Sequence, residues 1–162
     1  MKENPTEENV PKILNLPRHL GVIMDGNGRW AKLRGKRRIF GHEAGVIKAK
    51  EIVENSVKLK IEALTLFAFS LENWNRPSNE VNGLMRLFEG TINKYTSLLI
   101  ENNVRFKQVG SKEEQDKSLI RKLEQTEANG SENDSLKLTL EQTYGSRQDI
   151  IRGILDIIDG ID

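Results

Sequence analysis

The chain has 162 residues, with 25 Lys and Arg against 24 Asp and Glu, a net charge of +1 and no Cys. This length is enough for one domain with a buried core, and the absence of Cys excludes disulfides, cysteine-ligated zinc sites and thiol nucleophiles. The near-neutral charge argues against a dedicated nucleic-acid binder, and every apolar run is far shorter than the roughly 20 residues that a membrane-spanning helix needs.

The first residues differ in composition from the rest of the chain. Residues 1–16 combine acidic side chains with Pro5 and Pro11 and lack the basic and then apolar layout of a signal peptide. We expect these residues to form a flexible leader and residues 17–162 to form a single domain.

Hydrophobic periodicity predicts strands that alternate with helices. In chain order, the predicted elements are strand 20–24, helix 44–59, strand 63–69, helix 81–99, strand 104–109, helix 112–128, a polar loop 129–135, strand 136–140 and helix 147–158. The alternation predicts an α/β fold with a largely parallel sheet flanked by helices, and right-handed crossovers place such helices on both faces. Ligands of such sheets bind beyond the carboxyl ends of the strands.

One unusual loop follows the first predicted strand and reads Asp25-Gly-Asn-Gly-Arg29. Glycines let backbone N–H groups approach an anion, and a guanidinium matches phosphate oxygens, so the loop suits a diphosphate. Asp25 would repel phosphate directly but suits Mg²⁺, which takes one or two carboxylates together with phosphate oxygens. The alternative is an Asp-Gly turn that caps a helix.

A basic segment follows this loop, without an acidic residue between Asp25 and Glu43. Arg38 and His42 are four residues apart and so share one helical face, from which they can fold back over the same anion. For the neighbouring cations, Lys32, Lys36 and Arg37, an exposed basic surface is the simpler interpretation.

A second polar loop follows the second predicted strand. It carries Ser70, Glu72, Asn73, Trp74 and Arg76, and an exposed Trp among polar groups favours a functional loop. The alternative is a hydrogen-bonded turn before Pro77 in which Trp74 covers the core.

Other chemistries are not supported. Walker A, GxGxxG, GxSxG and HExxH motifs are all absent from the sequence, so nucleotide-binding, hydrolase and zinc-enzyme readings are not indicated. Apolar side chains such as Phe67, Phe69, Ile92 and Leu98 suit either an ordinary core or an apolar tunnel, and their spacing does not separate the two.

Two long motifs surround the two polar loops. The first is His19-Leu-Gly-Val-Ile-Met-Asp-Gly-Asn-Gly-Arg-Trp-Ala31, followed by Arg38-Ile-Phe-Gly-His42 and Gly45; the second is Leu64-Thr-Leu-Phe-Ala-Phe-Ser-Leu-Glu-Asn-Trp-Asn-Arg-Pro77. They resemble, in the same order, the signatures of the cis-prenyltransferases, the undecaprenyl diphosphate synthase family. The resemblance implies a Mg²⁺-dependent transferase that condenses isopentenyl diphosphate with a farnesyl-type allylic diphosphate to make a cis-polyprenyl diphosphate such as undecaprenyl diphosphate.

The resemblance also implies roles for individual residues. Asp25 matches the catalytic, Mg²⁺-binding aspartate, and Asn73 matches a residue often assigned a part in proton removal, although a neutral amide is a poor base and better suits orienting water or diphosphate. The matching substrate-binding residues are Gly26, Asn27, Gly28, Arg29, Trp30, Arg38, His42, Ser70, Leu71, Glu72, Trp74 and Arg76. The family further implies a homodimer in the cytoplasm, with at most peripheral contact at the inner face of the membrane and no nucleic-acid partner.

The sequence departs from the family pattern in its last third. The family's Asn-Tyr-Gly-Gly-Arg segment appears here as Gln142-Thr-Tyr-Gly-Ser-Arg147, and Gly110-Ser111 stands where an Asp is common. Family members also continue beyond the equivalent of Asp162 with Arg-Thr-Gly-Gly-Glu-like and Arg-x-Ser-Asn-Phe segments, which supply arginines, a second acidic metal ligand and much of the dimer interface. We therefore expect a truncated domain that lacks the C-terminal strands.

Three functional hypotheses follow. The first is an active cis-prenyltransferase. The second is a non-elongating relative that binds allylic diphosphate or pairs with a complete synthase subunit. The third is nucleic-acid binding through residues 29–38. This hypothesis is less attractive because the two family motifs explain the same positive charges, and because residues 29–38 contain few aromatic side chains on which bases could stack.

Overall fold

The computed structural model describes residues 15–160, so residues 1–14 of the predicted leader lie outside it. Its centre is a four-stranded sheet in the order β1-β2-β4-β3, formed by β1 (His19–Ile23), β2 (Ala63–Ser70), β4 (Leu136–Tyr144) and β3 (Val104–Val109). Every pairing is parallel, as the alternation of strands and helices predicts. Val22 pairs with Leu66, so β1 and β2 end side by side at the same edge of the sheet.

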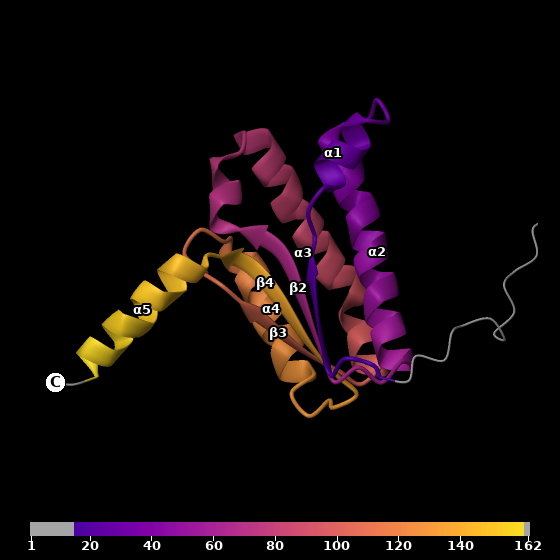
Figure 1. Ribbon diagram of the computed structural model, residues 1–162. Helices are drawn as coiled ribbons and strands as arrows, with labels where there is room; N and C mark the ends of the chain where they lie inside the picture. Colours follow the sequence, from indigo (N-terminus) through magenta and orange to yellow (C-terminus); the bar gives the residue numbers. More distant parts are fainter. Residues whose placement is uncertain (1–14, 161–162) are drawn as a thin grey trace, which may run out of the picture.

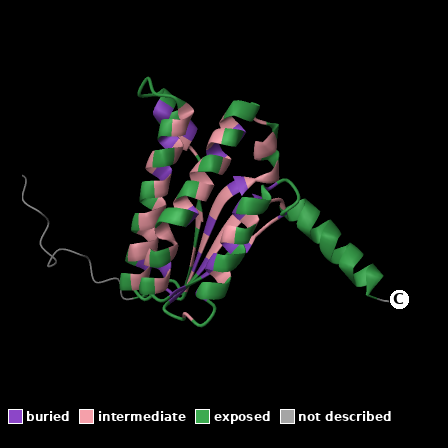
Figure 2. Ribbon diagram, turned by 180° about the vertical axis from the view of Figure 1, so that it is seen from behind, coloured by how far each residue is buried: buried purple, intermediate pink, exposed green. Residues whose placement is uncertain are grey.

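Three long helices connect the strands. They are α2 (Arg38–Lys58), α3 (Ser78–Glu101) and α4 (Lys117–Asn129), and α3 contacts both of the others. Seen from behind, they lie side by side in front of the sheet (Figure 2). The remaining helical segments are the short α1 (Asn27–Lys32), the 3₁₀ turn η2 (Leu71–Asn75) and α5 (Ser146–Asp159), which projects away from the other elements (Figure 1).

The core lies between these helices and one face of the sheet. Leu64, Leu66 and Leu138 are buried in the strands and pack in one cluster with Ile92 and Leu123 of the helices. On the opposite face, strands β3 and β4 carry charged and exposed side chains: Arg105, Lys107 and Lys137. Burial of one face stabilises the fold, at about 25 cal/mol per Å² of apolar surface.

The expectation of helices on both faces is wrong for residues 15–160. Helices α2, α3 and α4 contact the sheet, and α3 contacts the other two, whereas α5 has an exposed apolar side that includes Ile151, Ile154 and Ile158. Right-handed crossovers usually place helices on both faces of a doubly wound sheet. Here the charged side chains of Arg105 and Lys107 already indicate a face that is not packed against a helix.

The predicted elements are otherwise confirmed, with shifted boundaries. Helix α2 begins at Arg38 rather than at residue 44, and α1 and η2 occupy segments that the pattern indicates as loops. Helix α4 begins at Lys117 rather than at residue 112, because the Asp116 side chain caps it by accepting a hydrogen bond from the Ser118 N–H at 2.7 Å. Within residues 15–160, no helix is long and apolar enough to cross a membrane.

Candidate active site

A polar pocket lies beyond the carboxyl ends of β1 and β2, where ligands of parallel sheets are expected. The cavity volume is about 370 Å³, within the range of small-molecule sites. The pocket brings together most of the residues that the sequence singles out: Asp25, Gly26, Asn27, Gly28, Arg29, Arg38, His42, Ser70, Asn73 and Arg76.

Close packing of α1 against α2 forms one wall of this pocket. A Cβ atom on Gly41 would lie 1.9 Å from the Asn27 carbonyl oxygen, and one on Gly45 would lie 2.7 Å from the Asn27 amide nitrogen. A Cβ on Gly28 would lie 2.6 Å from the guanidinium carbon of Arg38. Glycine at these positions therefore allows the loop after β1 to lie directly on the start of α2, with the Arg38 guanidinium against it.

The Asp25 carboxylate stands at the open side of the pocket. It accepts a hydrogen bond from the Gly26 N–H and another from Arg29 Nη2 at 3.1 Å, and its side chain is 65% exposed. The Gly26 N–H and then the Arg29 guanidinium lower the pKa of Asp25 below its ordinary value. Asp25 is therefore ionised at neutral pH and accessible to a cation.

Glu80, on the first turn of α3, holds two arginines of the pocket. Its Oε1 atom accepts hydrogen bonds from Arg38 Nε at 2.9 Å and from Arg76 Nη1 at 3.2 Å, and its side chain is 15% exposed. Burial alone would raise the pKa of Glu80, but the hydrogen bond from Arg38 and the charges of both arginines outweigh it, so the pKa is lowered. One carboxylate thus orients two guanidinium groups, one from the first residue of α2 and one from the segment between η2 and α3.

The sequence analysis did not identify Glu80. Its signal is the spacing of Arg76 and Glu80, which are four residues apart at the start of a helix and can form an ion pair along it. The pattern alone does not show that Arg38, from another helix, reaches the same oxygen.

His42 faces this cluster with a buried ring nitrogen. Its Nε2 atom is 3.6 Å from Glu80 Oε1, too far for a hydrogen bond, and it has no hydrogen-bond partner among the described residues. Burial lowers the pKa of His42, although Glu80 partly opposes this shift. A bound anion would give this buried polar atom the partner that it lacks.

Ser70 and Asn73 fix the second polar loop. The Ser70 N–H donates to Asn73 Oδ1 at 3.3 Å, and the Ser70 side chain accepts a hydrogen bond from the Asn73 N–H in a reciprocal capping box. Because its Oδ1 is engaged, the Asn73 amide acts toward a ligand mainly as a donor. This arrangement is consistent with orienting a diphosphate or water and not with a basic role.

Four of the predicted substrate-binding residues do not line the polar pocket. Trp30 stacks on Phe40, with ring centroids 5.9 Å apart, and Trp74 packs edge-on against Phe69 at 5.5 Å, as the core-covering alternative predicts. Glu72 is exposed, and Leu71 lines a separate cavity near Gly145. Their roles in substrate binding stay predictions.

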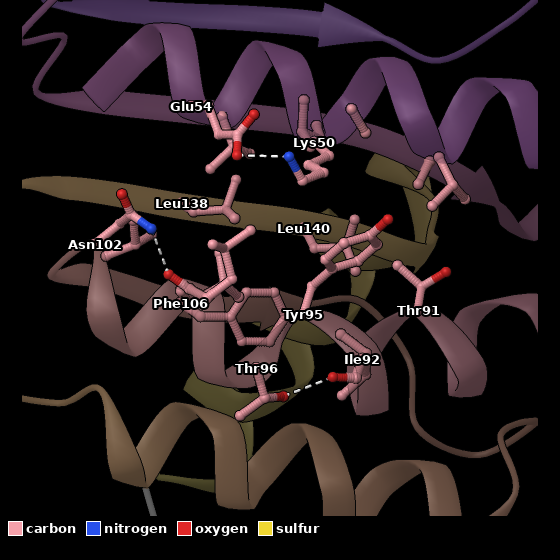
Figure 3. A pocket seen from close by; sticks show the side chains of 18 of the residues that line it. Lys50, Glu54, Thr91, Ile92, Tyr95, Thr96, Asn102, Phe106, Leu138 and Leu140 are labelled. Atoms are coloured by element: carbon pink, nitrogen blue, oxygen red, sulfur yellow. Dashed lines mark hydrogen bonds and ion pairs between the residues drawn. The ribbon is translucent and has the colours of Figure 1, made fainter. Parts of the chain in front are cut away.

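An apolar pocket opens next to the polar one, between α2, α3 and the sheet (Figure 3). Ile92, Tyr95, Leu138 and Leu140 project into it, while Lys50 and Glu54 form an ion pair of 2.6 Å at its α2 side. Met24 and Ala68 line both pockets. The sequence analysis left four apolar side chains open between an ordinary core and a tunnel. Two of them, Ile92 and Leu98, line the apolar pocket, and the other two, Phe67 and Phe69, line the polar pocket.

The donor set in the polar pocket fits Mg²⁺ only in company with a ligand. Among residues 15–160, no cluster of three or more His, Cys, Asp or Glu side chains could hold a metal ion. Asp25 offers one ionised and accessible carboxylate, and Mg²⁺ commonly binds one or two carboxylates with substrate phosphate oxygens and water completing its shell. A Mg²⁺ ion shared between Asp25 and a diphosphate is therefore compatible with this site.

Comparison with known proteins identifies the family. The family model described as "Putative undecaprenyl diphosphate synthase" matches residues 23–161, which is most of the chain. The chain belongs to the undecaprenyl diphosphate synthase family. A ditrans,polycis-undecaprenyl-diphosphate synthase ((2E,6E)-farnesyl-diphosphate specific) from Wigglesworthia glossinidia brevipalpis is 44% identical over 146 residues, and an isoprenyl transferase from Lactococcus lactis is 41% identical over 142 residues.

Solved structures agree with this assignment. Lavandulyl diphosphate synthase from Lavandula x intermedia, in complex with dimethylallyl diphosphate, matches with a TM-score of 0.86 and 31% identity over 90% of this chain. A probable undecaprenyl diphosphate synthase from Campylobacter jejuni matches with a TM-score of 0.73 and 29% identity. The chain spans 56% of the Wigglesworthia synthase, 58% of the Lactococcus transferase and 62% of the lavandulyl diphosphate synthase chain.

Proposed function

We propose that this member of the undecaprenyl diphosphate synthase family transfers an allylic group onto isopentenyl diphosphate and so elongates a cis-polyprenyl diphosphate. The observation that carries the proposal is the junction of two unlike pockets at Met24 and Ala68. One pocket has a carboxylate and three arginines, and the other is almost entirely apolar. A prenyl diphosphate has the same two parts, a charged head and a hydrocarbon tail.

The polar pocket supplies groups for the diphosphate head. Arg29, Arg38 and Arg76 offer guanidinium donors that match phosphate oxygens, and His42 Nε2 offers a buried atom without a partner. Mg²⁺, when bound between Asp25 and the head, would neutralise charge on the departing diphosphate. Donors fixed in advance by Glu80 and by the glycine contacts act on that charge without reorganising.

The proposed reaction breaks a C–O bond of the allylic diphosphate and forms a C–C bond with isopentenyl diphosphate. The C–O bond of the allylic diphosphate breaks, and its electron pair leaves with the diphosphate. The double bond of isopentenyl diphosphate supplies the pair for the new C–C bond, and loss of a proton from the adjacent carbon to a diphosphate oxygen forms the new double bond. Asn73, which is held by Ser70, would orient the groups that take part in this proton transfer.

The apolar pocket suits the tail of the allylic substrate. Ala68 is the smaller of the two side chains that line both pockets, and we propose that the hydrocarbon chain passes it to reach Ile92 and Leu138. We propose a farnesyl-type substrate on this basis and because the Wigglesworthia relative carries farnesyl-diphosphate specificity in its name. Burial of each methylene would contribute about 0.8 kcal/mol to binding.

Two measurements on the purified chain test the proposal. Calorimetric titration with farnesyl diphosphate and Mg²⁺ measures binding, and mass spectrometry after addition of isopentenyl diphosphate measures elongation. We expect Asp25→Asn to lower turnover about 100-fold or more, by analogy with the loss of other groups that stabilise developing charge. The control Asp156→Asn, on the exposed helix α5, should leave both measurements unchanged.

The outcomes separate the two readings of the site. Products that disappear in Asp25→Asn support the transferase. Saturable binding without products supports a non-elongating relative that binds allylic diphosphate. Absence of binding by the folded chain refutes both. We further propose a cytoplasmic location, as the family resemblance implies. Light scattering of the purified chain tests whether it forms the homodimer of the family.

A further inference from the structure

A second polar cavity, with a volume of about 350 Å³, lies beyond the carboxyl ends of β3 and β4. It shares no lining residue with the polar pocket or with the apolar pocket described above. One wall is the segment between β3 and α4, with Glu113 and Glu114. The other is the end of β4 with the first turn of α5, which includes Thr143 and Asp149 and lies next to that segment in Figure 1. It is called the acidic cavity here because carboxylates stand on both walls.

The acidic cavity has more negative than positive charge. Its lining includes the three carboxylates and one guanidinium, that of Arg152. Arg152 Nη2 lies 3.7 Å from Glu113 Oε1, so the one cation of the lining is already paired. Within residues 15–160, neither Glu114 nor Asp149 forms an ion pair with a cationic side chain. Two carboxylates on opposite walls are therefore available to a cationic ligand.

Thr143 supplies an observation that is independent of these charges. Its side chain lies in the wall of the acidic cavity and is 0% exposed, and its Oγ1 atom has no hydrogen-bond partner among the described residues. A buried hydroxyl without a partner costs free energy, because it has lost its hydrogen bonds to water. A donor group in the cavity would replace them.

The backbone at Thr143 is held in an unusual conformation. Its φ is 56°, in the left-handed region that a β-branched residue rarely adopts. The end of β3 holds it there: Gly110 packs directly against the Gln142 carbonyl group, and the Ser111 N–H donates to the Thr143 carbonyl oxygen at 3.0 Å. Conformations of this kind persist where the surrounding structure imposes them, and they cluster at ligand sites.

These features favour an organic cation over an anion or a metal ion. The N-terminal N–H groups of α5 could attract an anion, but Asp149 stands in that first turn and opposes it. The carboxylates do not form a group that could hold a metal ion, since no such group of three or more exists within residues 15–160. An ammonium group donates up to three hydrogen bonds and so suits a carboxylate together with a hydroxyl oxygen.

We propose that the acidic cavity binds a small aliphatic diamine. One ammonium group pairs with Glu114 on the first wall, and the other pairs with Asp149 on the second. One of the two also donates a hydrogen bond to Thr143 Oγ1. The Tyr144 hydroxyl, which donates to Asp149 Oδ2 at 3.4 Å, orients that carboxylate. Carboxylates on both walls favour a molecule with two ammonium groups over one with a single group.

Calorimetric titration of the whole chain with putrescine, the four-carbon diamine, tests this proposal. We expect saturable binding that weakens at high salt, because the cavity is open to solvent and its charges are screened. Butylamine has one ammonium group and should bind about fivefold more weakly. The diol 1,4-butanediol has the same length and no charge, and it should not bind.

Three variants locate the diamine. Glu114→Gln should weaken putrescine binding about fivefold, because it removes the charge of one carboxylate. Thr143→Val should weaken it about tenfold by removing an acceptor for a charged donor. Valine keeps the branched shape, so the free energy of unfolding should stay the same or rise once the unpartnered hydroxyl is gone. Arg152→Gln should strengthen binding up to about fivefold, because it removes the competing cation.

Glu132→Gln is the matched control. Glu132 is exposed in the loop between α4 and β4, at the opposite end of β4 from the acidic cavity, and its replacement changes the net charge as Glu114→Gln does. We expect Glu132→Gln to bind putrescine as the unmodified chain does. Melting curves followed by circular dichroism show whether each variant is folded.

Four outcomes would overturn the proposal. The first is a folded chain that does not bind putrescine, and the second is an equal loss of affinity in Glu114→Gln and Glu132→Gln, which would mean binding by net charge alone. The third is unchanged binding by folded Thr143→Val. The fourth is binding of 1,4-butanediol as tight as that of putrescine, which would assign the acidic cavity to a neutral polyol.

Discussion

Replacement of Glu80 by Gln tests the electrostatic design of the pocket. Glutamine keeps the size of the side chain and one hydrogen-bond acceptor but removes the negative charge that faces Arg38 and Arg76. The contacts at stake are 2.9 Å and 3.2 Å long, and the three side chains are between 15% and 32% exposed. Two cations would then stand close together without a partner for their charge.

The expected loss of stability follows from this partial burial. Removal of one partner from a fully buried ion pair costs about 3–5 kcal/mol, whereas an exposed pair contributes at most about 1 kcal/mol. Glu80 is nearly buried but its partners are about one-third exposed, so we expect Glu80→Gln to lower the free energy of unfolding by about 2 kcal/mol. The same change should weaken diphosphate binding, because Arg38 and Arg76 lose the contact that orients them.

Urea denaturation followed by circular dichroism measures the loss, with Glu89→Gln as the control. Glu89 also lies on α3 and pairs with Lys122 at 2.7 Å, but both side chains are more exposed, at 37% and 35%. We expect Glu89→Gln to cost less than about 1 kcal/mol. Equal losses for the two variants would refute the argument that burial of Glu80 decides the magnitude.

The pH dependence gives a second check on Glu80. Because the folded state lowers its pKa, the stability that Glu80 contributes is present above the unfolded value of about 4.3 and is lost as the pH falls through the folded value. The difference between the unmodified chain and Glu80→Gln should therefore shrink as the pH falls from about 5 towards 3. A difference that is constant over this range would mean that the charge of Glu80 is not its cause.

Three further tests probe other parts of the molecule. Gly41→Ala should destabilise the chain by about 1–3 kcal/mol, because the new Cβ meets the Asn27 carbonyl oxygen. The control Gly90→Ala, in open space on α3, should stabilise the chain by up to about 1 kcal/mol. Melting curves compare the two variants. Ala68→Leu should narrow the passage between the pockets, so that affinity for dimethylallyl diphosphate is kept while affinity for farnesyl diphosphate falls about tenfold; equal losses in calorimetry would contradict a passage at this residue. Burial lowers the pKa of His42 and a bound anion raises it, so diphosphate binding should take up more protons in the unmodified chain than in His42→Gln. Calorimetry in buffers of different ionisation enthalpy measures this proton uptake. Equal proton uptake by the two proteins would mean that the anion does not lie against the His42 ring.

Local patterns were sufficient to predict the strands and most of the helices. The runs at 20–24 and 63–69 are apolar because β1 and β2 are part of the sheet, and a polar loop follows each of them, so a shared pocket at their ends could be expected. The order of the strands depends on packing between distant segments, which periodicity does not report. The start of α2 was misplaced because Gly41 and Gly45 weaken the helical pattern, while in the structure they allow the contact with Asn27.

The sequence predicted only part of the candidate site, because local patterns report contacts between neighbouring residues and not contacts between distant segments. Residues that act through a local motif, such as Asp25 with Arg29 and Ser70 with Asn73, are visible as clusters in the sequence. Glu80 was not predicted because one of its two arginine partners, Arg38, lies on another helix and is 42 residues away in the sequence. Trp30 was grouped with the pocket on resemblance, whereas its ring lies against Phe40 outside the polar pocket.

The contact of the loop after β1 with α2 has a thermodynamic consequence for binding. Because Gly28 lies against Arg38 and Gly41 lies against Asn27, the phosphate-facing loop is already in place before a ligand arrives. A ligand that enters such a site pays little conformational entropy, since few backbone torsions are left to order. The heat capacity change of diphosphate binding should therefore report burial of the hydrocarbon tail alone, without a contribution from folding of the loop.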